Sequence, residues 1–187
     1  PPPKIVIALS WWLVIRIMLG AGLIKLRGDD CWTELTCLYT HFETQPVPNP
    51  LSPYFHSLPN WMLQLGTLGN HIVELIVPLF LLAPRPLRNT AAIILILFQA
   101  TLILSGNLSF LNWLTILPCL LCIDDSLWKK ILPFSLQLRI PMDPRPPTHV
   151  QNLPRYLYAG LVMYLSVPVA QNLISTEQSM NRSFDSL

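Results

Sequence analysis

Charged residues are scarce in this chain: Asp, Glu, Lys and Arg make up 12% of its 187 residues, whereas soluble domains carry about 25%. The longest uncharged stretch is residues 90–123, where 34 consecutive positions contain no Asp, Glu, Lys, Arg or His. The mean hydropathy is +0.46, and a net charge of +2 is too small to indicate a nucleic-acid partner. The sequence therefore predicts an integral membrane protein made of helices.

The sequence does not begin with methionine, and it shows no evident pattern of a cleavable signal peptide. Residues 5–26 are too long for the apolar part of a signal peptide and contain Arg16. The last residues, 175–187, are polar and complete no element. We interpret the sequence as a fragment, with 175–187 as the start of a truncated C-terminal region.

The uncharged run of residues 90–123 predicts a helical hairpin. As one helix it would be about 51 Å long at 1.5 Å per residue, too long for a hydrocarbon core of about 30 Å. Ser105-Gly106-Asn107 divides it into two spans of roughly 17 residues, and Gly106 and Asn107 tolerate the left-handed backbone of a tight turn. One long kinked helix is the alternative.

The remaining chain alternates apolar and polar segments. We expect a bundle over residues 1–123, a polar segment at 124–154, and further spans at 5–26, 61–83 and 155–174. Residues 28–60 form a long connection with prolines at 46, 48, 50, 53 and 59, which favour extended backbone over a regular helix. A short basic turn is expected at 84–88. Five crossings fit this pattern, and three fit if 61–83 does not span and 90–123 crosses once.

Basic residues indicate which side each connection faces. Lys and Arg are absent from 28–60, which has four acidic residues, but they occur in 84–88 and in 124–154. Cytoplasmic connections are enriched in Lys and Arg. We therefore expect 84–88 and 124–154 in the cytosol, and 28–60 and the tail on the lumenal side.

Four polar residues lie within the predicted spans. Arg16 and Lys25 are in the first span, and His71 and Glu74 lie three residues apart on one face of the next. Charges inside a bilayer are costly unless paired, and antiparallel packing can bring Glu74 toward Arg16 or Lys25. The hypotheses are a structural ion pair, or a proton relay or substrate site. No sequence pattern of a catalytic site or metal centre accompanies them, and we expect no cofactor.

The four cysteines lie in two groups along the sequence, with two close together in each. Cys31 and Cys37 lie in the predicted lumenal connection, where they can form a disulfide or stay as thiols. Cys119 and Cys122 are embedded in apolar sequence, which predicts inert buried thiols. Asn181-Arg-Ser183 is a candidate N-glycosylation site beyond the last span.

The segment 41–50, HFETQPVPNP, is the most distinctive part of the connection. A stiff proline-rich backbone loses little entropy on binding, so the segment suits either a protein-binding surface or a lid packed over the helices. The candidate binding residues are His41, Phe42, Glu43, Thr44, Gln45, Pro46 and Pro48.

Several strings, HFETQPVPNP, NHIVELIVP, FQATLILSGNLSFLNWLT and SVPVAQNLIS, resemble the lipase maturation factor family, and its first member more than its second. The resemblance implies a central piece of a multi-pass endoplasmic reticulum membrane protein. It implies a non-enzymatic role in the folding, dimer assembly and secretion of dimeric secreted lipases (lipoprotein, hepatic and endothelial lipase). Other folding factors of that compartment are further expected partners.

A second resemblance concerns architecture. Residues 16–25, with Glu74 in the next helix, are similar to the DoxX-type four-helix membrane bundle and, more distantly, to the membrane part of vitamin K-dependent carboxylase. This implies four helices in 5–123 with a fifth span added. Because that wider group includes enzymes, it leaves open the rival hypothesis of a membrane enzyme or small-solute carrier using Arg16, His71 and Glu74.

Overall fold

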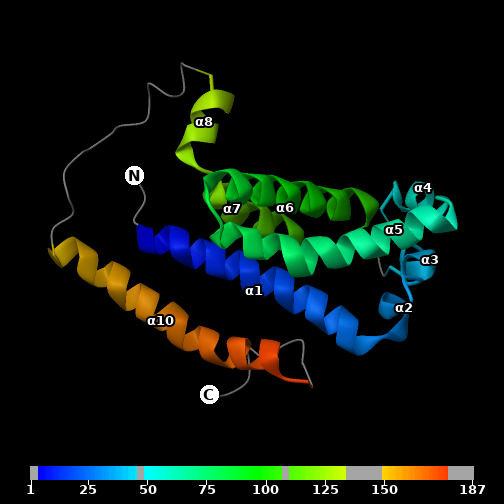
Figure 1. Cartoon of the computed structure of the whole chain (residues 1–187), viewed down its shortest axis with the longest axis horizontal. Coiled ribbons are helices and arrows are strands. Elements are labelled where there is room, and N and C mark those ends of the chain that lie inside the picture. Colours follow the sequence, from blue (N-terminus) through cyan, green and yellow to red (C-terminus); the bar gives the residue numbers. More distant parts are fainter. Residues whose placement is uncertain (1–3, 46–48, 107–109, 134–148, 177–187) are drawn as a thin grey trace.

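The computed structural model describes residues 4–45, 49–106, 110–133 and 149–176, and every regular element in these ranges is helical (Figure 1). The predicted all-α class is confirmed. In chain order the elements are α1 (Lys4–Gly28), α2 (Asp30–Thr33), α3 (Leu38–His41), α4 (Ser52–His56), α5 (Asn60–His71), the π-helix η1 (Ile72–Ile76), the 3-10 helix η2 (Val77–Leu82), α6 (Arg85–Ser105), α7 (Leu111–Cys122), α8 (Asp125–Ile131) and α10 (His149–Ile174).

Four helices in the described ranges are long and apolar enough to cross a membrane. They are Lys4–Gly28, Asn60–Leu82, Arg85–Ser105 and Leu153–Ile174, of 25, 23, 21 and 22 residues. The chain is therefore a multi-pass membrane protein. The second half of the expected 90–123 hairpin is represented by α7, whose 12 residues extend only about 18 Å.

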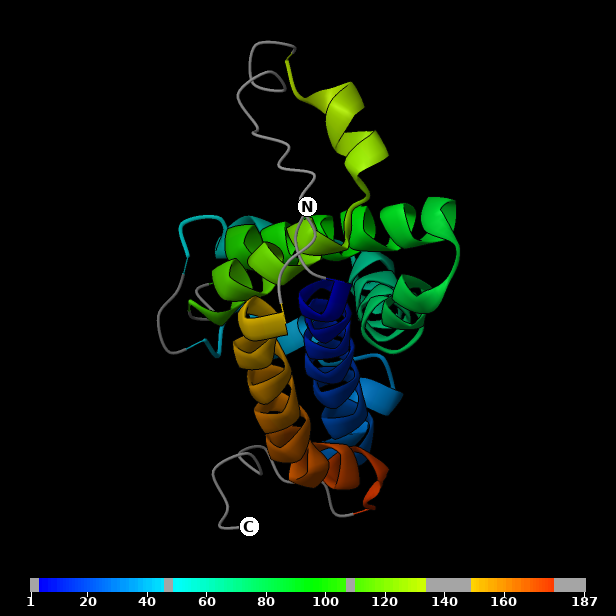
Figure 2. The same cartoon turned by 90° about the vertical axis from the view of Figure 1, so that its left-hand side faces the viewer.

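The core lies where α1 meets η2, α6 and α7. Val14 and Met18 of α1 pack against Leu81, Leu95 and Cys119 of these helices, and all five are nearly or fully buried. On its other side α1 lies along α10 (Figure 2). Gln99 donates to the Met18 sulfur at 3.4 Å and accepts from Asn112 at 2.9 Å. Such interhelical hydrogen bonds help to hold membrane helices together, where no hydrophobic effect drives association.

The helix from Asn60 to Leu82 changes its winding in the middle because of Pro78. Proline lacks an N–H donor, and its ring clashes with the carbonyl four residues earlier, here that of Glu74. The chain responds with a π-turn, in which the Val77 N–H bonds the Ile72 carbonyl, followed by 3-10 winding. This places Glu74 within an irregular, buried part of the helix.

The predicted hairpin, formed by α6 and α7, is present, and Asp124, just after α7, contacts the start of α6. The Asp124 N–H donates to Asn89 at 2.9 Å, and the Asp124 carboxylate lies 3.4 Å from Arg85 and 3.5 Å from Arg88. The chain thus returns after α7 to the end of the bundle where α6 began. The expected turn at 84–88 is instead the first turn of α6, since Pro84 precedes the helix and Pro86 stands in its first turn, where no N–H donor is needed.

Gly106 differs from its predicted role. Its φ of −159° is extended rather than left-handed, and Asn107 lies outside the described residues. A side chain at this position would collide with Gln45. Glycine thus allows the Gln45 side chain of the 28–60 connection to lie close against the end of α6.

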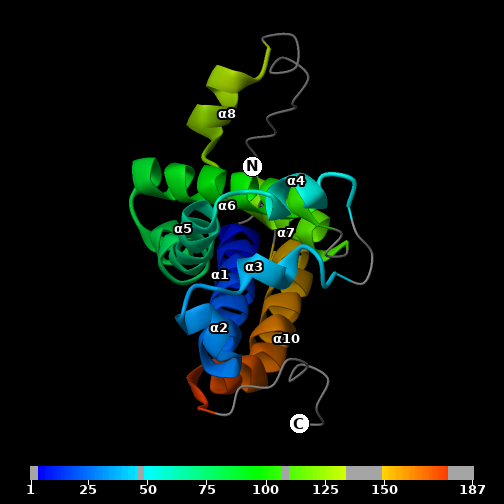
Figure 3. The same cartoon turned by 90° about the vertical axis from the view of Figure 1, so that its right-hand side faces the viewer.

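That connection forms a folded cap, which we define as residues 29–59 without 46–48 (Figure 3). It contains three short helices, α2, α3 and α4, and α4 lies within the proline series where we expected extended backbone. Helix α4 forms in spite of Pro53, because that proline occupies its first turn. Asn49 donates to the Ile103 carbonyl at 3.0 Å and Ser52 to the Ser105 carbonyl at 2.8 Å, so the cap is fixed to the C-terminal end of α6.

The final helix begins earlier than predicted, at His149 rather than Arg155, and runs parallel to α1. The Arg27 guanidinium donates to the Leu173 carbonyl at 3.2 Å, which joins the ends of α1 and α10 on the cap side of the bundle.

Candidate functional site: a buried ion pair beneath a disulfide-bonded cap

The most polar point within the bundle is an ion pair between α1 and η1. The Lys25 ammonium lies 2.6 Å from a Glu74 carboxylate oxygen, and Glu74 is only 3% exposed. Asn70 joins both partners, because its carbonyl accepts from Lys25 and its amide donates to Glu74, each at 3.0 Å. The Lys25 ammonium also lies 4.8 Å from the centre of the Trp32 ring, within the range of a cation–π contact.

His71 connects this cluster to the cap. Its Nε2 lies 2.9 Å from the Trp32 carbonyl oxygen, and its ring meets the Trp32 ring edge-on at 6.0 Å. Trp32 therefore contacts the cluster through its ring, above Lys25, and through its backbone. Helix α2 of the cap cannot move without disturbing both contacts.

Arg16 does not join the cluster. Its guanidinium donates to Ser166 of α10 at 3.4 Å, and Trp12 donates to the same hydroxyl at 3.0 Å. Nine residues separate Arg16 from Lys25, which turns them about 180° apart on a helix of 3.6 residues per turn. The two cations therefore face different helices, and Glu74 pairs with Lys25.

A disulfide joins Cys31 and Cys37 within the cap. It links the first turn of α2, where Cys31 precedes Trp32, to Cys37, the residue before α3. The predicted buried character of the other two cysteines is confirmed, since Cys119 and Cys122 are 0% and 1% exposed and remain thiols.

The cap separates the candidate binding residues into inward and outward sets. Phe42 is 7% exposed and packs against Phe55, whereas Glu43 and Thr44 are exposed. His41 is half-buried, and burial, with a smaller contribution from the charge of Lys25, lowers its pKa. Gln45 lies against Gly106. Pro46, Pro48 and the glycosylation candidate Asn181 lie outside the described residues.

A cavity of about 550 Å³ separates the cap from the bundle. His41, Phe42 and Phe55 line it from the cap, and Gly66 and Leu97 line it from α5 and α6. The lid interpretation of segment 41–50 fits its inward residues, while Thr44 and Glu43 are exposed, and Glu43 pairs with His56 of α4 at 2.9 Å.

Sequence reasoning missed Asn70, Trp32 and Tyr54. Asn70 precedes Glu74 by four residues, so helical spacing could have identified it as a ligand of the pair. Trp32 could be placed only once the fold of the cap was known. Tyr54 is 71% exposed on α4, where no helix was expected.

The polar atoms of Lys25, Asn70 and Glu74 are matched to one another, whereas the neighbouring His71 Nδ1 is buried without a hydrogen-bond partner. No cluster of three or more His, Cys, Asp or Glu residues that could hold a metal occurs in the described part of the chain. The geometry is that of a structural contact that joins α1, η1 and the cap.

Comparison with known proteins identifies the family. Residues 1–130 match the family model described as lipase maturation factor transmembrane domain. The chain belongs to the lipase maturation factor family. It is 46% identical to mouse lipase maturation factor 1 and 46% identical to human lipase maturation factor 1, with 100% of the chain and 35% of each relative covered. Lipase maturation factor 2 of Xenopus laevis is 39% identical over 63% of the chain and 17% of that relative.

These values confirm the predicted closeness to the first member of the family. The chain spans about a third of the length of these first-member relatives. No solved structure matches the chain, so the DoxX-type resemblance stays a prediction. The family is one of maturation factors rather than of known enzymes.

Proposed function

We propose that this chain is the membrane part of an endoplasmic reticulum factor that assists folding, dimer assembly and secretion of secreted lipases, and that it acts by binding rather than by catalysis. The observation that carries the proposal is the 46% identity to lipase maturation factor 1 over the whole chain. The family name supports lipases as clients. The enzyme or carrier hypothesis receives no support from the relatives.

We further propose that the cap faces the lumen. In support, the cap side carries the acid-rich 28–60 connection, while Lys4, Arg85, Arg88 and Asp124 gather at the opposite end of the bundle. The bias of Lys and Arg toward cytoplasmic connections then directs the opposite end to the cytosol. Because Asp124 returns to the start of α6, α7 counts as a crossing in spite of its length, which gives five in all.

In this proposal the outward surface of the cap meets the client. Glu43, Thr44 and Tyr54 form this surface, and all three are exposed. The bundle supplies a fixed base, through the Lys25–Glu74 pair, the disulfide and the hydrogen bonds to α6. A rigid surface loses little entropy on binding, which suits a factor that must recognise incompletely folded clients.

The test is rescue in cells that lack the endogenous factor. Expression of the full-length parent of this chain is expected to restore the activity of secreted lipoprotein lipase at least several-fold over empty vector. A secreted enzyme that is not a lipase, measured in the same medium, should not change. Normal accumulation of the parent without any gain in lipase activity would contradict the proposal.

A further inference from the structure

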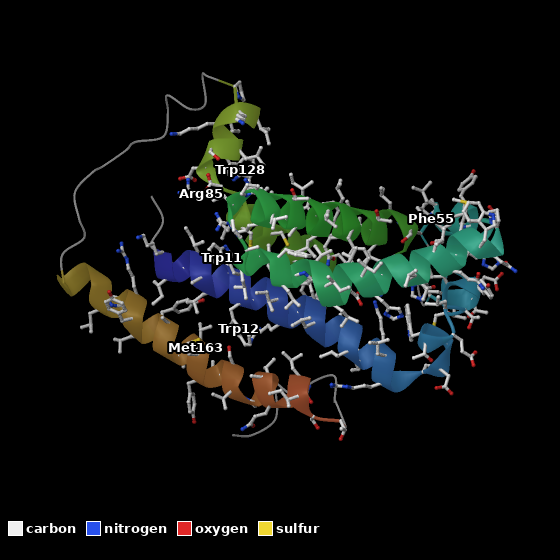
Figure 4. The ribbon with its side chains drawn as sticks, viewed as in Figure 1. Trp11, Trp12, Phe55, Arg85, Trp128 and Met163 are labelled. Atoms are coloured by element: carbon white, nitrogen blue, oxygen red, sulfur yellow. A yellow bond between two sulfur atoms is a disulfide. The ribbon has the colours of Figure 1, made fainter. Side chains whose placement is uncertain are left out.

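A second cavity lies at the end of the bundle opposite the cap. It has a volume of about 560 Å³ and lies between α1, α6, α7 and α8. Figure 4 shows Trp11, Arg85 and Trp128 converging there from α1, α6 and α8, while Trp12 points toward Met163 of α10. The Lys25–Glu74 pair and the cap do not contribute to it.

Two buried donors at this cavity have no acceptor. The Trp11 indole N–H and the Arg88 Nε are both shielded from solvent and lack a hydrogen-bond partner. The Arg88 guanidinium stacks over the Trp11 ring at 4.8 Å, so the two donors lie close together. Buried polar groups without partners are rare in folded proteins and call for an explanation. A ligand that brings acceptor oxygens would satisfy both donors.

The charges around the cavity favour an anion. Lys4, Arg85 and Arg88 line it, against Asp124 and Asp125. Asp124 already contacts both arginines, and hydrogen bonds from Ser126, with the nearby arginines adding to them, hold its pKa below the usual range. Three cations against two carboxylates leave an excess of one positive charge, and Arg85 is 76% exposed.

The rest of the lining is mainly apolar. Ile7 of α1 and Leu120 and Leu121 of α7 form this part, and Leu121 is 50% exposed. A soluble anion would leave these side chains uncovered. A phospholipid would satisfy both parts, with its headgroup oxygens at the donors and an acyl chain along α1 and α7.

We propose that this cavity binds one anionic phospholipid from the leaflet on this side, with headgroup oxygens accepting from Trp11 and Arg88. Basic pockets between membrane helices are known to hold such headgroups. The site is independent of the lipase-related role. Its occupant would add to the contacts of Asp124 with Arg85 and Arg88, and of Arg88 with Trp11, which already join α1, α6 and the start of α8.

The test uses the full-length parent in mild detergent, titrated with phosphatidylserine and with phosphatidylcholine and followed by native mass spectrometry. Phosphatidylserine is expected to bind more tightly. Trp11→Phe keeps the ring but removes the N–H, and it should weaken phosphatidylserine binding about tenfold, as expected for a lost hydrogen bond to a charged group. Trp12→Phe is the matched control, because its N–H is already used by Ser166, and it should bind like the parent.

Arg85→Gln changes an exposed side chain and should also weaken phosphatidylserine binding. It keeps the proposal testable if Trp11→Phe fails to fold. Equal affinity for the two lipids, or unchanged binding by Trp11→Phe and Arg85→Gln, would overturn the proposal. Millimolar inorganic phosphate should not displace the lipid. Displacement would mean a soluble-anion site and would equally overturn it.

Discussion

Replacing Glu74 by glutamine is expected to lower the free energy of unfolding of the full-length parent by about 3 kcal/mol, because it leaves the Lys25 ammonium partly buried without its counter-ion. Removing one partner of a buried pair costs about 3–5 kcal/mol. The lower end applies here, since the Lys25 side chain is 22% exposed. Thermal unfolding in detergent, together with cellular abundance, measures the effect.

The matched control is Glu34→Gln, which changes an exposed carboxylate of the cap and should leave stability unchanged. The double variant Lys25→Met/Glu74→Leu removes both charges and should recover much of the loss, since apolar replacement of a whole pair is often neutral. A Glu74→Gln protein as stable as the parent would contradict the structural assignment of this pair.

Replacing Gly22 by alanine is the second change with a large expected effect. A Cβ atom here would lie 2.7 Å from Leu75 Cδ2 and 3.0 Å from Glu74 Cβ, so the Leu75 side chain would have to shift or α1 and η1 would have to separate. Overpacking of this kind costs about 1–3 kcal/mol, more than the gain of up to about 1 kcal/mol that alanine brings to a helix. We expect a net loss of about 1–2 kcal/mol, measured by thermal unfolding.

Gly160→Ala in α10 is the control, because a Cβ there meets no atom within 4 Å. The same substitution should therefore be neutral or slightly stabilising. If Gly22→Ala were also stabilising, the close contact between α1 and η1 described above would be wrong.

The sequence predicted the membrane helices well, since their signal is local. We could predict the hairpin in 90–123 from the length of the uncharged run and from the turn residues Ser105-Gly106-Asn107. The ends of the elements were harder, because the prolines at 53 and 86 stand in the first turn of a helix, where proline is readily accommodated. Position within the helix, rather than proline content, decided these cases.

The site was predictable in part. Lys25 and Glu74 were candidates because charges in a membrane helix require a partner. Arg16 could have been separated from Lys25 by counting helical turns, since nine residues place them on opposite faces. The inward orientation of Phe42 could not be predicted, because it depends on how α3 packs against α5 across a connection without periodicity.

The most direct test of the account is rescue of secreted lipase activity by the full-length parent carrying Thr44→Arg and Tyr54→Arg on the outward surface of the cap. Lys130→Glu, an exposed charge change on α8 at the other end of the bundle, is the control. We predict that the cap variant accumulates and melts like the parent but loses most of the rescue, while Lys130→Glu rescues fully. Full rescue by the cap variant would contradict the claim that this surface meets the client.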